Sequence, residues 1–83
     1  TQTQVLDAIS RAALMLERQD AAQSGLQLLL NEFRRSLLQT SGQAATTVLY
    51  HGKIKSYLLQ HPSNYPDSVA ALSSLLDHFV AAQ

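Results

Sequence analysis

Apolar residues recur every three or four positions along most of the chain, a spacing typical of amphipathic helices. In the first such segment the apolar positions share one side of a helical wheel, and the charged positions fall elsewhere. We therefore expect a helix over residues 3–19, with Thr3 as its N-cap. Its shared apolar side consists of Val5, Ile9, Ala12, Ala13 and Leu16.

Two further segments show the same spacing, and they predict helices over residues 24–40 and 66–82. The first of them follows a lapse of the apolar pattern around residues 19–25, where Asp20 and Ser24 are turn or cap candidates and Gly25 is permissive. It ends before Gly42, a residue suited to the left-handed position after a helix. The second begins at Pro66, because proline fits the first position of a helix. The apolar faces are Leu26, Leu29, Leu30, Phe33 and Leu37, and then Val69, Leu72, Leu76, Phe79 and Val80.

The stretch between them, residues 46–59, fits two structures. A β-hairpin would pair two short strands across a turn at His51 and Gly52. The second strand would not keep alternating, however, because Tyr57, Leu58 and Leu59 are consecutive. An isolated hairpin also needs a third strand, and none is available. We therefore favour a helix over residues 44–60 and keep the hairpin as the minority alternative.

As a helix, this stretch has apolar residues on two opposite sides, and both sides have to be covered. One side can pack on the rest of the chain, and the other is then expected to meet a partner. The sequence leaves open which side is which. Tyr50 and Tyr57 are the first interface candidates, because aromatic anchors are favoured at protein interfaces. The two candidate sets are Tyr50, Ile54, Tyr57 and Leu58 on one side, and Val48, Leu49 and Leu59 on the other.

The predicted fold is all-α: a small four-helix bundle of antiparallel neighbours with short loops, forming a single domain over residues 1–83. A chain of 83 residues has a thin core, and without cysteine it has no disulfide to reinforce that core. Only 14% of its residues are charged, and the net charge is zero. These features favour association with another chain.

No group of residues predicts catalysis, a metal site or a cofactor. His51, His61 and His78 lack metal-binding spacing, and no two acidic residues are forced onto one helix face next to a histidine. We expect neither an enzyme nor a cofactor-binding protein, and the role of His51 stays open. No apolar run approaches the roughly 20 residues that a membrane helix needs.

The function expected from these features is protein–protein interaction, by a small homodimeric regulator, adaptor or chaperone-like protein that buries a second apolar helix face. We expect it to be cytoplasmic. The chain begins at Thr1 without a methionine, so we expect it to be processed or to be part of a longer protein.

The alternative function is a DNA-binding transcriptional regulator. It requires a divergent helix-turn-helix around Val48–Leu58 with its turn at Gly52. The zero net charge argues against it, because nucleic-acid binding draws on a basic excess. The candidate phosphate contacts are Arg34, Arg35, Lys53 and Lys55.

Overall fold

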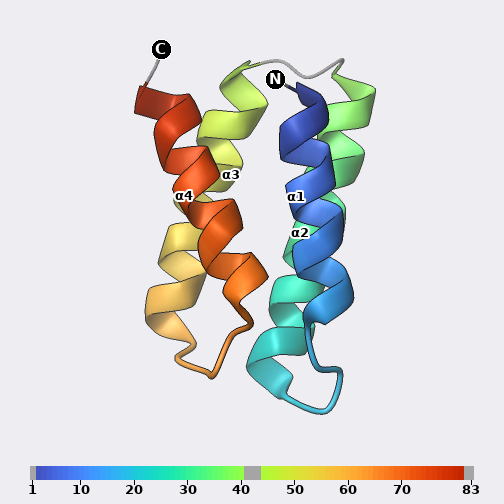
Figure 1. The fold of residues 1–83 in the computed structure, drawn as a ribbon, viewed down its shortest axis with the longest axis vertical. Helices are drawn as coiled ribbons and strands as arrows, with labels where there is room; N and C mark the ends of the chain where they lie inside the picture. The colour runs from blue at the N-terminus through green and yellow to red at the C-terminus, as the bar shows by residue number, and fades with distance from the viewer. Residues whose placement is uncertain (1, 41–43, 82–83) are drawn as a thin grey trace.

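The computed structural model describes residues 2–40 and 44–81, and they form four α-helices. The helices are α1 (Gln2–Met15), α2 (Ala21–Gln39), α3 (Ala44–Gln60) and α4 (Asp67–Ala81). They run alternately up and down, and each packs against two neighbours in a closed ring in which α1 also contacts α4 (Figure 1). The described residues include no strand. The prediction of an all-α four-helix bundle is therefore confirmed.

The core is built from the apolar faces of all four helices. Buried positions recur at helical spacing, as with Val69, Leu72 and Leu76 on α4. This spacing turns one stripe of each helix toward the bundle axis. Among the described residues, the buried apolar set is Val5, Ile9, Ala12, Leu16, Leu26, Leu30, Phe33, Leu37, Tyr50, Ile54, Val69, Leu72 and Leu76.

The turn between α1 and α2 lies earlier in the chain than predicted. The Asp20 carboxylate accepts hydrogen bonds from the backbone N–H groups of Ala22 (2.9 Å) and Gln23 (3.3 Å), so α2 begins at Ala21. Helix α1 ends at Met15 and not at residue 19. Thr3 lies inside α1 and is not its N-cap.

Gly25, expected at the boundary between this turn and the helix, lies well inside α2, where Tyr57 of α3 packs directly over it. A Cβ atom at position 25 would collide with the Tyr57 hydroxyl oxygen. That hydroxyl donates a 2.6 Å hydrogen bond to the carbonyl of Ala22. The glycine therefore allows a close contact between two helices, a use that its position in the sequence does not reveal.

The other helix ends lie close to their predicted positions. Helix α2 ends at Gln39, where the N–H and hydroxyl groups of Thr40 both donate to the Ser36 carbonyl, at 3.0 and 2.7 Å. Gly42 lies outside the described residues. Helix α4 begins at Asp67, one residue later than predicted, and the Pro66 carbonyl accepts the N–H of Val69 at 3.0 Å.

Helix α3 is continuous from Ala44 to Gln60. The hairpin alternative is therefore wrong, and so is the helix-turn-helix, because no turn interrupts the chain at Gly52. The buried residues of α3 are Thr47, Tyr50 and Ile54, spaced by three and four positions. That spacing lets a helix bury all three on one side, whereas a strand would point Thr47 and Tyr50 to opposite faces.

Candidate interaction surface

The inward side of α3 is fixed by Tyr50, which is buried against α2. Its ring stacks on Phe33, with centroids 4.9 Å apart and planes at 9°. Its hydroxyl donates to Glu32 Oε2 at 2.9 Å and lies 3.1 Å from Ser36 Oγ. The phenol therefore combines core packing with satisfied polar contacts, as a buried tyrosine requires.

The remaining residues of this side also pack on the chain's own core. Ile54 is buried, and Tyr57 and Leu58 are partly buried against the core cluster. The Tyr57 ring stacks on His61, with centroids 4.2 Å apart. This side of α3 therefore faces the core, with Tyr57 and Leu58 still partly exposed. The expectation that Tyr50 leads a partner interface is corrected, because Tyr50 is buried against α2. Tyr57 also contacts α2, but it stays partly exposed and lines a groove between α2 and α3.

The opposite side of α3 faces solvent, and none of its residues is charged. Val48, Leu49 and Leu59 are 43%, 56% and 83% exposed. The other exposed positions on this side carry small or uncharged polar side chains. We call the whole set the α3 outer face: Ala45, Val48, Leu49, Gly52, Ser56, Leu59 and Gln60.

Part of the outer face borders a shallow groove between α2 and α3, with a volume of about 560 Å³. Leu29 of α2 and Leu49 of α3 contribute to its walls, together with Gly52 and Ser56. A Cβ atom built on Gly52 would meet no described atom within 4 Å outside its own helical backbone. Packing within the described chain therefore gives no reason for a glycine at this position.

Large exposed apolar residues also lie on α1 and α2. Leu28 is 70% exposed and lies one helical turn from the exposed Glu32 of α2. Leu14 is 83% exposed near the end of α1, beside Met15, and Leu38 is exposed near the end of α2. Single surface leucines are common and define no site.

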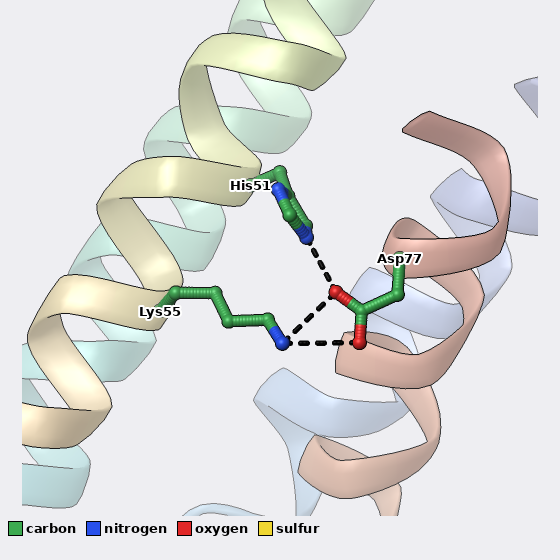
Figure 2. A network of polar contacts seen from close by, with 3 residues as sticks. All are labelled: His51, Lys55 and Asp77. Carbon is green, nitrogen blue, oxygen red and sulfur yellow. Dashed lines mark hydrogen bonds and ion pairs between the residues drawn. The ribbon is translucent and has the colours of Figure 1, made fainter. Parts of the chain in front are cut away.

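A polar network borders the outer face where α3 meets α4 (Figure 2). His51 Nε2 lies 2.5 Å from Asp77 Oδ1, and Lys55 Nζ contacts both carboxylate oxygens, at 2.9 and 3.0 Å. The hydrogen bonds from His51 and then from Lys55 lower the pKa of the Asp77 carboxyl below its ordinary value of 3.8. This network links α3 to α4 by polar contacts. Sequence reasoning missed it, because the facing register of the two helices leaves no sequence signal.

The four basic residues proposed to contact DNA do not form one surface. Lys55 is paired with Asp77 on the α4 side of α3. Lys53 lies 3.9 Å from Glu32 Oε2 and above the Tyr50 ring, on the α2 side. Arg34 lines a separate groove between α1 and α2, and Arg35 is exposed on α2. Two of the four charges are therefore compensated, and the others lie on a different helix.

The described residues include no group of three or more acidic or histidine side chains that would hold a metal ion. Nor do they include a helix with the length and apolar character needed to cross a membrane. No family model, curated protein or solved structure matches the chain. Clues to the function therefore have to come from the surface of the bundle.

Proposed function

We propose that this protein is a protein–protein interaction module that acts as a homodimer, in the manner of a small regulator, adaptor or chaperone-like protein. The observation that supports this proposal is the α3 outer face. It carries seven exposed residues without a charge, and three of them are large and apolar.

Burial of this face is favourable for two physical reasons. Apolar surface removed from water contributes roughly 25 cal/mol per Å². The face also contains no charge, so contact with a second apolar surface does not desolvate an ion. A bundle of 83 residues has a thin core of its own, and it gains more from association than a large domain does.

The zero net charge of the chain suits a second copy as the partner. Two identical copies carry the same surface, so a strongly charged chain would repel itself. Here six basic residues balance six acidic ones. Symmetric pairing through one shared patch is also the commonest form of soluble oligomer.

Sedimentation across a dilution series tests this proposal, and the chain offers a closely matched pair of variants. Leu59 on the outer face and Leu14 on α1 are both 83% exposed. Leu59→Glu is expected to weaken the dimer at least tenfold, because it introduces a charge into the contact. Leu14→Glu is expected to leave the dimer unchanged. A wild-type chain that stays monomeric at high concentration contradicts the homodimer, as does equal weakening by both variants.

A further inference from the structure

We infer that two copies join by packing α3 against α3 in antiparallel orientation, about a two-fold axis that passes beside Gly52. This inference rests on the proposed homodimer and adds its geometry. The partner surface is the same outer face on a second copy, with no additional segment or ligand. Three features of that face support the arrangement: the order of side-chain sizes, the open glycine and the position of the nearest charges.

Large and small side chains alternate along the outer face in such a way that the face fits a second copy running in the opposite direction. Its central seam reads Ala45, Leu49, Gly52, Ser56 and Leu59. Ala45 and Leu59 each lie seven positions from Gly52, on opposite sides of it. Reversal about Gly52 therefore sets the leucine of one copy against the alanine of the other at both ends of the contact.

The inner positions follow the same rule. Leu49 lies three positions before Gly52, and Ser56 lies four positions after it. In the antiparallel pair, each Leu49 faces the partner's small Ser56 within about one residue rise, or roughly 1.5 Å. Large side chains then fill the spaces above small ones, as close packing of helices requires.

A parallel pair would lack this complementarity. Leu59 would face the partner's Leu59, and Ala45 would face the partner's Ala45, so the helices would be held apart at one end and leave a gap at the other. The dipoles of two parallel helices would also be unfavourably aligned. The antiparallel arrangement is therefore the one that fits the sequence of the face.

Gly52 marks the point of closest approach. Glycine in the interior of a helix is unfavourable relative to alanine, and nothing described in the chain approaches its open side within 4 Å. On a two-fold axis the same position meets its own copy. The absence of a side chain there lets the two helix backbones come closer than any other residue allows.

The charges nearest the axis do not oppose the contact. Lys53 and Lys55 lie on the two flanks of α3 and are paired within each copy, with Glu32 and Asp77 respectively. The contact therefore buries no unpaired charge. One helix face is small compared with stable interfaces, which bury about 1,200–2,000 Å² in total, so we expect an association that is readily reversed by dilution.

Disulfide trapping tests the geometry, because the wild-type chain has no cysteine. A disulfide requires Cα atoms about 4.4–6.8 Å apart. The cysteine variants are mixed under mild oxidation, and Gly52 is left unchanged because any side chain there would hold the two helices apart. Ala45→Cys mixed with Leu59→Cys is expected to give the mixed dimer at least tenfold faster than either variant links alone. Leu14→Cys on α1 serves as the control that does not link.

The outcomes separate this inference from the proposed function. If Ala45→Cys and Leu59→Cys each link to themselves but not to each other, the helices are parallel and the inference is wrong. If the wild-type chain sediments as a dimer but no α3 cysteine links, another face forms the dimer, and homodimerisation itself stands. A monomeric wild-type chain overturns both.

Gly52→Ala adds a test that does not depend on oxidation. At a dilution where the chain is monomeric, its melting temperature is expected to rise, because the added methyl group meets nothing in the chain. At high concentration its dimer is expected to be at least tenfold weaker. Unchanged dimerisation would show that the helices do not cross at this residue.

Discussion

The two sides of α3 are both apolar in sequence, yet they differ in how their residues are held. Inward residues carry aromatic rings whose hydroxyl groups are fixed by α2, as with Tyr50 on Glu32 and Tyr57 on the Ala22 carbonyl. The outward leucines have no polar group and no such partner. The difference shows that apolar content alone does not decide which side of a helix is buried. On the inward side the tyrosine hydroxyl groups also find hydrogen-bond partners on α2, in addition to the apolar packing of residues such as Ile54.

The glycines at positions 25 and 52 express the same contrast. Both lie inside helices, where glycine is normally unfavourable. Gly25 is required by the hydroxyl of Tyr57, whereas the open side of Gly52 has no described neighbour. Gly25 is therefore explained by a contact within the chain. In our proposal, Gly52 is explained by a contact with a second copy.

The largest expected effect separates the two sides of α3 directly. Ile54→Ala removes a buried side chain and is expected to lower the free energy of unfolding by about 2–5 kcal/mol. Leu59→Ala removes an exposed one and is expected to change it by less than about 0.5 kcal/mol. Urea denaturation at a concentration where the chain is monomeric measures both. Should Ile54→Ala fail to fold, Ile54→Val gives a graded loss of about 0.5–1.5 kcal/mol.

A smaller loss is expected from Gly25→Ala, about 1–2 kcal/mol, because overpacking outweighs the gain in helix propensity. The new methyl group would displace Tyr57 and break its hydrogen bond to Ala22. A double-mutant cycle with Tyr57→Phe checks the cause by urea denaturation. In the Tyr57→Phe background the same substitution should cost less, since the colliding oxygen is gone. An equal loss in both backgrounds would place the strain elsewhere.

The opposite sign is expected for Gly52→Ala, a gain of about 1 kcal/mol in the unfolding free energy of the monomer. The position is exposed, and an added Cβ atom meets no described neighbour. The measurement is again urea denaturation at low concentration, with Gly25→Ala as the matched control. A loss of stability at position 52 would mean that an internal contact constrains it after all.

Much of the fold follows from the sequence, because the periodic apolar positions of α1, α2 and α4 coincide with the buried faces. The turn before α2 was misplaced, since Asp20 and Ser24 both fit a cap and only the geometry shows that Asp20 binds the N–H groups of Ala22 and Gln23. The buried Gln23 amide also accepts the Glu17 N–H at 2.9 Å and donates to the Asn64 carbonyl at 3.1 Å. That contact spans two distant loops.

The outer face was predicted only as one of two possibilities. The helical wheel of α3 shows two apolar sides but does not show which of them faces the core. That depends on where the neighbouring helices lie. Because Tyr50 and Tyr57 pack against α2, the opposite residues Val48, Leu49 and Leu59 are the exposed set. The pairing of His51 and Lys55 with Asp77 likewise depends on the register of α3 against α4, which periodicity within one helix does not encode.

The smallest expected effect concerns Asp77, whose network joins one flank of α3 to α4. Its folded pKa lies below the unfolded value of 3.8, chiefly because of the hydrogen bond from His51. A depressed carboxyl pKa stabilises the fold at pH above the unfolded value, and that contribution is lost as pH falls through the folded pKa. The melting temperature of the wild-type chain should therefore fall as the solution is acidified below 3.8.

Asp77→Asn isolates this contribution from that of Asp20, whose pKa is also lowered, mainly by its hydrogen bond with Ser63. At neutral pH the variant should melt slightly below the wild type, because the amide carries no charge for Lys55. The difference should narrow as pH drops below 3.8, where the wild-type carboxyl also becomes neutral. If the difference in melting temperature between the variant and the wild type stays constant with pH, Asp77 acts through packing and not through its charge. The stabilising effect of Asp77 on the contact between α3 and α4 would then not depend on its ionisation.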